Sequence, residues 1–562
     1  MYRFLGHFGA GLPAHRLRAA AAQLRTGPPG GLCLHHGEGW ALAAGRASAL
    51  GDVTAVLDGE IDNRLALATR LEVRGHAVAD RNDPALLRSA FELDGAEFAA
   101  HLEGGYAAAV VDARAEPVLV LATDAAGTTP LYYHWEPGRG RLCFASDVPA
   151  LLALLPDPPG LWEPGLDAYL TTGAPLDGRT LIEGVRMLPP GTTAVCSHRT
   201  GLRLVRRAGA ARRTVPAPGT AAGARERLLE QVRRRSGGAG PLCVLGSGGP
   251  GAELVAELAG AARPELASVG VPDGGVPGSG GLDPARLPEL LPELAWRLGQ
   301  PDPDPAALRG FALFEAARRA GFRTALATDP VEELAEGRRR VGAAVRAGSA
   351  AAYADTLGPV PAGARSRLYS SEYRAYLAGR GDAARSLAER LGGGAELAGA
   401  AARFELEVLL PARGLRRLAH LSAAHGVRAR LPLSPRRAWA ALPAAGPGAA
   451  GQPVTALLTR DGPLAALALE VLSPGRLRSS GLLDPAAVGS LLAAQFDRPS
   501  DRLAATVWSL LMFELWREEY AVAVRRPARP AEVLTLTAAG RWRAGPAAGP
   551  AVAAAAAARA PG

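Results

Sequence analysis

Residues 242–253, which read LCVLGSGGPGAE, join a short apolar run to a glycine-rich turn and then to a helical run. Glycines let the backbone turn tightly and present consecutive N–H groups, and the start of a helix adds partial positive charge. Such a turn can hold an anion such as pyrophosphate without side chains. We therefore predict a phosphate cradle in which Ser247, Gly248 and Gly249 bind a nucleotide. An ordinary tight connection between strand and helix is the alternative interpretation.

The positions after this turn lack the groups that a metal-bound nucleotide requires. Pro250, Gly251 and Ala252 carry neither a carboxylate nor a hydroxyl. Magnesium prefers hard oxygen ligands, normally with one or two carboxylates among them. The segment therefore predicts a phosphate cradle without its metal-binding part.

Length and composition indicate two globular domains. The 562 residues exceed what one core usually holds, and a hydrophobic content of 48% is ample for two. The chain has no uncharged apolar run of about twenty residues, and its start resembles no export signal. We expect a cytoplasmic protein that does not enter a membrane. The four cysteines lack metal-ligand spacing, so we expect reduced thiols, with Cys143, Cys196 and Cys243 buried.

The positive charges are all arginine. The sequence contains no lysine, so arginine accounts for all 63 Lys+Arg positions, and the net charge is +9. Chemistry that needs a deprotonated ammonium or a lysine Schiff base is therefore excluded. The arginines are dispersed and few aromatic residues lie among them, so nucleic-acid binding is not favoured.

The sequence pattern of the chain changes after about two hundred residues. Residues 1–207 carry apolar strand-like runs such as TAVLDG and PVLVLATD, separated by turns, with helical patterns around 83–93 and 149–155. Residues 208–220 are rich in Ala, Arg and Pro and read as a linker. Residues 221–525 are helix-rich, with strands at 242–245 and 323–327 that predict a βαβ unit and a parallel sheet. Residues 526–562 form an Ala/Pro-rich tail that we expect to be partly disordered.

Ordered segments of the first domain resemble the asparagine synthetase family in its glutamine-dependent form, including β-lactam synthetases and lasso-peptide macrolactam cyclases. LDGEIDN at 57–63 is similar to the family's Asn-Gly-Glu-Ile-Tyr-Asn segment, and Asp83 stands where the family has a substrate-pocket aspartate. The other matching stretches are LEGGYAAAVVD, LATDAAGTTPLYYHW, LCFASDVPALL and LIEGVRMLPPGT. Five matches in order are more specific than any one of them.

The second domain continues the resemblance. PLCVLGSGGPGAE stands in place of the family's Ser-Gly-Gly-x-Asp-Ser pyrophosphate loop, and ALATDPVEELAEG in place of its Gly-Asp-Gly-Gly-Asp-Glu-Leu-Phe-x-Gly turn. The remaining matches are GQPDPDPAAL, AHGVRARLPLSP and TVWSLLMFELWREEY. The resemblance implies an α+β part followed by an α/β part, namely an Ntn-type αββα sandwich and a helix-rich adenylate-forming PP-loop domain. It also implies glutamine hydrolysis by an N-terminal cysteine, and adenylation of a carboxylate with ATP and magnesium before an amine forms the amide.

The first domain departs from the family at its reactive residues. Position 2 is Tyr, so removal of Met1 exposes no thiol, and we expect no glutaminase activity. Asp58 replaces the pocket Asn that helps to bind an oxyanion, and a carboxylate there would repel one. Asp58, Gly59 and Asp83 thus form a vestigial glutamine pocket, with a structural role favoured for Gly59 and Asp83.

The second domain departs from the family at its metal and phosphate sites. Gly251 replaces the loop Asp, which leaves Glu332 and Glu333 as the candidate magnesium ligands. A solvated acidic pair at a helix start is the more ordinary interpretation of these two residues. Pro330 and Val331 replace flexible glycines beside them.

The acceptor side and the late lysine of the family are also changed. Arg428 replaces a Glu and Pro435 replaces an Asp in the stretch that shapes the acceptor side. The family's lysine would fall near 454–460, where Arg460 is the candidate substitute, and a planar guanidinium does not equal a compact ammonium at a tuned catalytic site.

Two functions therefore stay open. We favour an asparagine-synthase-like protein with degenerate glutaminase and ATP/Mg sites that has impaired or no catalysis and binds a partner. The partner would be an active homologue, a precursor peptide or a second copy of the chain. The alternative is an active ATP-dependent amide ligase or macrolactam cyclase that uses a substrate amine, with ATP and magnesium as cofactors and an amino acid or peptide as substrate.

Overall fold

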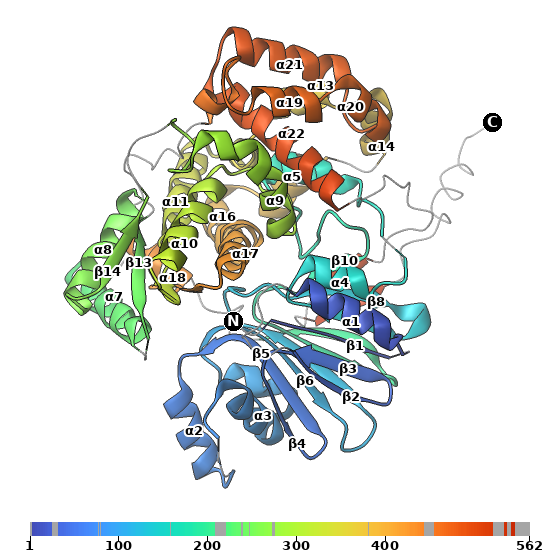
Figure 1. Ribbon diagram of the computed structural model, residues 1–562, viewed down its shortest axis with the longest axis vertical. Helices are drawn as coiled ribbons and strands as arrows, with labels where there is room; N and C mark the ends of the chain where they lie inside the picture. Colours follow the sequence, from blue (N-terminus) through green and yellow to red (C-terminus); the bar gives the residue numbers. More distant parts are fainter. Residues whose placement is uncertain are drawn as a thin grey trace.

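The computed structural model describes most of the chain between residues 3 and 520. The described residues are 3–9, 11–24, 32–76, 78, 80–157, 159–207, 221–237, 240–246, 248–271, 276–379, 382–442 and 454–520, with the strands at 533–536 and 541–545. The predicted linker at 208–220, the predicted ligand Ser247 and the rest of the tail lie outside these ranges. The antiparallel strands of the first part and their flanking helices lie at one end of the molecule, and the helix-rich second part lies above them (Figure 1).

The first part contains two antiparallel sheets. The six-stranded sheet has the order β10 (Val185–Met187), β8 (Tyr132–Glu136), β9 (Arg141–Ala145), β1 (Phe4–Phe8), β3 (Trp40–Ala44) and β2 (Cys33–Gly37). The eight-stranded sheet has the order β17 (Val533–Leu536), β18 (Arg541–Gly545), β12 (Gly201–Arg206), β11 (Thr192–Ser197), β7 (Val118–Thr123), β6 (Gly104–Asp112), β5 (Val53–Ile61) and β4 (Ala47–Leu50). Strands β17 and β18, which extend this sheet beside β12, were not predicted from the sequence.

The two sheets pack face to face between two layers of helices. The side chains of β5 show how the layers form, because alternate residues of a strand point to opposite faces. Val56 joins the core between the sheets, whereas Ala55 and Leu57 join the core beneath the helices. Helices α2 (Arg64–Val73) and α3 (Asp83–Asp94) cover that outer face, and α1 (Ala14–Gln23) and α4 (Val148–Leu154) cover the six-stranded sheet. The result is the predicted αββα order of layers.

The second part is built on a parallel sheet of four strands. Its order is β14 (Ala267–Gly270), β13 (Leu242–Gly246), β15 (Thr324–Leu326) and β16 (Arg428–Arg430). The predicted βαβ unit is present, because β13 leads through the glycine turn into α8 (Pro250–Ala262) and pairs in parallel with β14 and β15. Helices α7 (Ala221–Ser236) and α8 lie to one side of β13 and α10 (Ala306–Arg319) to the other (Figure 1).

Helices make up most of the remaining second part. They are α9 (Leu287–Leu298), α11 (Asp329–Ala347), α12 (Ala350–Asp355), α13 (Ala362–Leu368), α14 (Ser371–Ala378), α15 (Ala383–Leu391), α16 (Leu397–Phe404), α17 (Arg416–His425), α18 (Pro435–Ala441), α19 (Ala465–Val471), α20 (Pro474–Ser480), α21 (Pro485–Asp497) and α22 (Asp501–Glu519). Two π-helical segments, η5 (Glu405–Leu409) and η6 (Pro411–Leu415), connect α16 to α17. Most apolar residues of α22 are buried, among them Trp508 and Trp516, so this helix anchors the core of the second part.

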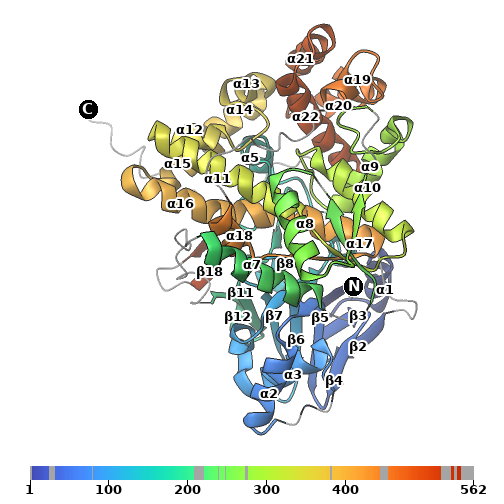
Figure 2. The same cartoon turned by 90° about the vertical axis from the view of Figure 1, so that its left-hand side faces the viewer.

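The two parts share one continuous core. Buried residues of the six-stranded sheet and of α4, such as Tyr132 and Leu151, belong to the same apolar cluster as α9, α17 and α22. Helix α5 (Pro164–Thr172) of the first part lies among the helices of the second, where the hydroxyl of its Tyr169 donates to the carbonyl of Ser509 at 3.0 Å. The two parts therefore meet over a broad packed surface (Figure 2).

Two sequence predictions about environment can be compared with this fold. Cys143, Cys196 and Cys243 are buried and free of disulfides, as predicted, whereas Cys33 is exposed. Within the described ranges, every helix is too short or too polar to cross a bilayer.

Candidate functional site

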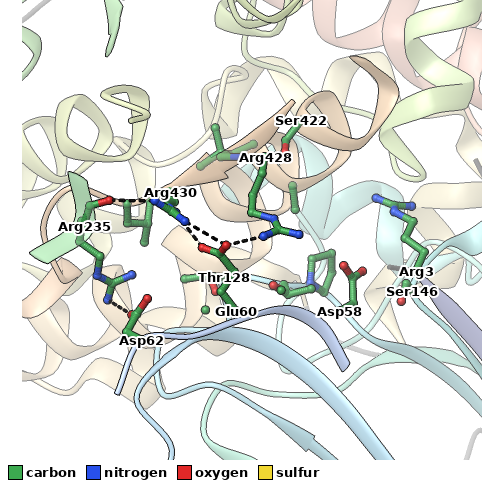
Figure 3. A pocket seen from close by; sticks show the side chains of 18 residues that line it. Arg3, Asp58, Glu60, Asp62, Thr128, Ser146, Arg235, Ser422, Arg428 and Arg430 are labelled. Carbon is green, nitrogen blue, oxygen red and sulfur yellow. Dashed lines mark hydrogen bonds and ion pairs between the residues drawn. The ribbon is translucent and has the colours of Figure 1, made fainter. Parts of the chain in front are cut away.

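A small cavity lies where β5 of the first part meets β16 of the second (Figure 3). Its volume is about 70 Å³, and it contains two of the three residues of the predicted glutamine pocket, Asp58 and Gly59. The third, Asp83, does not line it. Asp83 begins α3 and holds Arg64 at the start of α2, with a second contact from Arg64 Nη2 to Asp83 Oδ2 of 2.8 Å. The structure therefore brings Asp58 and Gly59 together and gives Asp83 a structural ion pair.

Gly59 has a backbone reason to be glycine. Its φ is +113°, and a Cβ at this position would lie 2.1 Å from the carbonyl oxygen of Gly105 on the neighbouring strand. A side chain would therefore push β5 away from β6. This geometry supports the structural role that the sequence analysis favoured for Gly59.

Asp58 presents an unpaired carboxylate to the cavity. The residue is 4% exposed, and it makes no hydrogen bond or ion pair with any described residue. Figure 3 shows its side chain pointing away from β5 toward the second part. A buried anion at this position would repel a developing oxyanion. The predicted loss of glutamine hydrolysis at this cavity stays a prediction.

The next acidic residue on β5, Glu60, closes the boundary between the two parts. Its carboxylate accepts hydrogen bonds from Arg428 and from Arg430, whose Nε lies 2.7 Å from Oε2. Burial alone would raise the pKa of Glu60, but the hydrogen bond from Arg430 and the charges of both arginines outweigh it and lower the pKa to about 2. Asp62 extends the row with an ion pair to Arg235 at 2.8 Å. We call Glu60, Asp62, Arg235, Arg428 and Arg430 the interface ion-pair cluster.

Sequence reasoning missed this cluster. It identified Arg428 only as a replacement on the acceptor side, and it assigned no role to Glu60. The two residues are 368 positions apart, and nothing in either segment shows that β5 faces β16. The one available signal was the change from Glu to Arg at position 428, which suits an acidic partner.

The glycine turn after β13 forms the second candidate site. Gly248 and Gly249 have φ values of +76° and +94° and lead into α8. The guanidinium of Arg309 lies against the turn, with Nη2 3.4 Å from the position that a Cβ of Gly248 would take. Arg309 makes no ion pair within the described ranges, and its Nε is buried without a partner. The turn therefore has the predicted shape and an unpaired cation beside it.

The N-terminus of α8 is occupied by a carboxylate of the chain itself. Oε1 of Glu332, from the first turn of α11, accepts a hydrogen bond from the backbone N–H of Ala252 at 2.6 Å. A helix N-terminus attracts anions because its first N–H groups have no partner within the helix. Burial raises the pKa of Glu332, and the N–H groups of Ala252 and Gly251 oppose that rise. Glu332 thus sits where a phosphate would approach α8.

Glu333 turns to a different set of partners. Its carboxylate lies 3.6 Å from both Arg413 and Arg417, in a buried cluster that also contains Asp302 and Asp304. Nη1 of Arg417 lies 3.3 Å from Asp302 and 2.9 Å from Asp304. We call Asp302, Asp304, Glu333, Arg413 and Arg417 the buried ion cluster. Each carboxylate of this cluster lies within 3.6 Å of at least one guanidinium group.

The two predicted magnesium ligands therefore do not face one common site, and their role in metal binding stays a prediction. Consecutive helical residues point about 100° apart, so Glu332 and Glu333 reach different neighbours. Glu332 accepts a hydrogen bond from the backbone at the N-terminus of α8, and Glu333 faces two arginines. Among the described residues, no group of three or more His, Cys, Asp and Glu side chains is arranged to hold a metal ion.

Arg460 lies in another region of the second part. Its guanidinium donates to Asp497 of α21 at 2.8 Å and lies 6.0 Å from the ring of Phe496, and its side chain is 67% exposed. Helix α21 is at the top of the molecule, whereas α8 and the glycine turn are at the side (Figures 1 and 2). The structure therefore does not bring the predicted lysine substitute to the glycine turn.

The contact between Glu332 and α8 depends on Gly251. A Cβ at this position would lie 2.8 Å from Oε1 of Glu332 and 3.0 Å from a methyl group of Val331. We expect Gly251→Ala to lower the free energy of unfolding by about 1–2 kcal/mol, because it crowds this contact. Gly260→Ala in the same helix meets open space and should instead raise it by about 0.5–1 kcal/mol. Urea unfolding of both variants measures the difference, and equal effects would contradict the assignment of Glu332 as the ligand of α8.

Comparisons with known proteins agree with part of the sequence analysis. Residues 46–204, which include the Asp58 cavity strand, match the model of the glutamine amidotransferase domain family. The match covers less than half of the 562 residues. It confirms the resemblance of the first part to glutamine amidotransferases. The resemblance of the second part to a synthetase domain stays a prediction.

Two solved structures share weaker similarity with the chain. Glutamine phosphoribosylpyrophosphate amidotransferase from B. subtilis aligns at 13% identity over 47% of this chain and 65% of its own, with a TM-score of 0.28. A class-II glutamine aminotransferase domain protein from Silicibacter pomeroyi aligns at 16% identity over 36% of this chain and 97% of its own, with a TM-score of 0.21. Comparison with curated proteins gives no match.

Proposed function

We propose that this chain is an asparagine-synthase-like protein whose glutaminase and ATP/Mg sites no longer catalyse, and that it acts by binding. One observation carries the proposal: both candidate magnesium ligands serve the protein itself, Glu332 at the start of α8 and Glu333 in the buried ion cluster. Because Glu332 is held at the start of α8 and Glu333 faces two arginines, we infer that neither carboxylate places a metal on a triphosphate at the turn.

The first part supports the same proposal. Its amidotransferase-like cavity presents the Asp58 carboxylate where an oxyanion would need donors. The interface ion-pair cluster also fills the boundary between this cavity and the second part. A reactive small molecule formed in the cavity would therefore have to pass a row of charged side chains to reach the second part. The partner that we propose is an active homologue or a peptide.

One observation favours the alternative, an active ATP-dependent amide ligase that uses a substrate amine. Arg309 places an unpaired guanidinium beside Gly248, and guanidinium groups bind phosphate oxygens well. An ATP phosphate could pair with Arg309 if Glu332 moved away from α8. The two proposals therefore differ in whether Glu332 can be displaced.

The test measures nucleotide binding and turnover with the full chain. We expect no magnesium-dependent ATP binding by calorimetry, and no pyrophosphate release with ATP, magnesium and a panel of amino acids and peptides. Glutamine should release no ammonia. The control is Glu332→Ala, which frees the N–H groups of α8 and should bind ATP or inorganic phosphate more tightly than the parent. Micromolar magnesium-dependent binding of ATP by the parent chain would refute the proposal and favour the ligase.

A further inference from the structure

A second cavity lies between the two parts, away from both candidate sites. Its volume is about 230 Å³, and it shares no lining residue with the Asp58 cavity. Its walls come from the segment 175–190 and β12 of the first part, and from α15, α16, η5 and η6 of the second. Neither the amidotransferase resemblance nor the proposed loss of catalysis assigns it a role.

Arginine dominates the charge of this cavity. Four arginines line it, at positions 179, 206, 390 and 403, against two acidic residues, Asp177 and Glu407. Both carboxylates already have partners. Asp177 holds Arg390 at 2.5 Å, and Glu407 holds Arg206 and Arg436, each at 2.5 Å.

Two of the four arginines have no acidic partner. Arg179 and Arg403 make no ion pair with any described residue. Arg179 lies over the ring of Trp162 at 4.7 Å. Burial and the nearby charge of Arg186 lower the pKa of Arg179 to about 10, so the group stays charged at neutral pH in a place that is short of negative charge. An anion in the cavity would supply that charge.

The other walls are apolar. Met187, Pro189, Leu391, Phe404, Val408 and Pro411 line the cavity beside the arginines. This combination of a few cations with apolar walls is typical of pockets that bind small organic molecules, where charge fixes the orientation and burial supplies affinity. A bare inorganic anion would leave the apolar walls without contact.

The backbone around the cavity is irregular. The π-helical segments η5 and η6 form one side, and π-helical turns are found frequently at functional sites. Asp177 at the rim has a φ of +58°, and among the described residues it is the one non-glycine residue with a positive φ. In a regular α-helix, the side chains of Glu407 and Val408 would point in other directions. The π-helical backbone of η5 therefore helps to shape the cavity.

We propose that this cavity binds a small organic acid. Its carboxylate pairs with Arg179 and Arg403, and its apolar body packs against Met187 and Phe404. The arginine forks suit a carboxylate because they donate two parallel hydrogen bonds. The site lies at the junction of the two parts, so the ligand contacts both and strengthens their association.

The experiment uses the full chain and calorimetric titration with four probes. 4-Phenylbutyrate has the charge and the apolar body, acetate has the charge alone, 4-phenylbutanol has the body alone, and phenyl phosphate has another anionic group. We expect phenylbutyrate to bind more tightly than the other three. Equal binding of the alcohol, no binding of phenylbutyrate up to its solubility limit, or preference for phenyl phosphate would overturn the proposal.

Variants connect the binding to the two unpaired arginines. Arg179→Gln and Arg403→Gln should each weaken phenylbutyrate binding by about tenfold or more. Arg478→Gln, an exposed arginine on α20, is the matched control and should bind as the parent does. Circular dichroism and thermal unfolding establish that each variant is folded. Arg403 is exposed, so Arg403→Gln tests the site with little risk to the fold. Unchanged affinity in folded Arg403→Gln would contradict the proposal.

Discussion

Replacing Arg417 by methionine is expected to lower the free energy of unfolding by about 3–5 kcal/mol at pH 7. Arg417 is 3% exposed and lies at hydrogen-bond or ion-pair distance from Asp302, Asp304 and Glu333. Methionine fills much of the same volume but removes the guanidinium that these three carboxylates share. Breaking a buried ion pair from one side costs more than the pair contributes, because an uncompensated charge remains in the core.

The effect of Arg417→Met should depend on pH in a defined direction. Burial already raises the pKa of Glu333 in the parent chain, and loss of Arg417 should raise it further. A buried carboxyl group with a raised folded-state pKa costs least free energy when it is protonated. The loss of stability in Arg417→Met should therefore become smaller as the pH falls toward the range where free carboxyls titrate. Urea unfolding at several pH values measures this. The control is Arg478→Met, an exposed change that should alter stability by less than about 0.5 kcal/mol. A deficit independent of pH would contradict the electrostatic explanation.

Glu60→Gln is expected to remove about 3 kcal/mol of stability at pH 7. The pKa of Glu60 is lowered from 4.5 to about 2, mainly through Arg430 and Arg428 acting against burial. A carboxyl group with a lowered folded-state pKa stabilises the protein above its unfolded value, and it loses this contribution as the pH falls through its folded value. The parent chain should therefore lose stability between about pH 5 and pH 2 through this group. The Glu60→Gln variant would lack that part of the acid response.

The measurement compares unfolding at pH 7 and pH 3 for Glu60→Gln and for a matched variant. Glu103→Gln serves as the control, because Glu103 is exposed and its side chain makes no hydrogen bond or ion pair within the described ranges. Glu103→Gln should keep the acid response of the parent. An unchanged pH response in Glu60→Gln would show that the interface ion-pair cluster does not hold the two parts together.

Local pattern predicted the fold where neighbouring residues decide it. The apolar run and the glycine turn at 242–253 gave β13 and α8, because tight turns and helix starts depend on residues close in sequence. The strand-like runs were visible in the sequence, whereas the αββα order of layers was implied by the family resemblance, and Val56 and Leu57 of β5 enter the two cores that this order requires. The two strands in the predicted tail were missed, because Ala, Pro and Gly around them indicate a loop.

The candidate sites depended on contacts that no local pattern contains. Glu332 and Glu333 read as one acidic pair, yet a helix turns them to α8 and to Arg417. Arg460 was placed by its distance along the chain from other family motifs, and its partner is Asp497. The pairing of Glu60 with Arg428 required the relative position of the two parts, which separate patterns in β5 and β16 do not specify.

The carboxylate of Glu332 at α8 has a consequence for competition with dissolved anions. Because it is attached to the same chain, its effective concentration at the helix end is fixed by geometry and does not fall on dilution. A free phosphate must overcome this intramolecular rival before it gains any bond to the backbone. Sensitivity to phosphate would therefore arise by a single substitution at position 332, without any change in the turn itself.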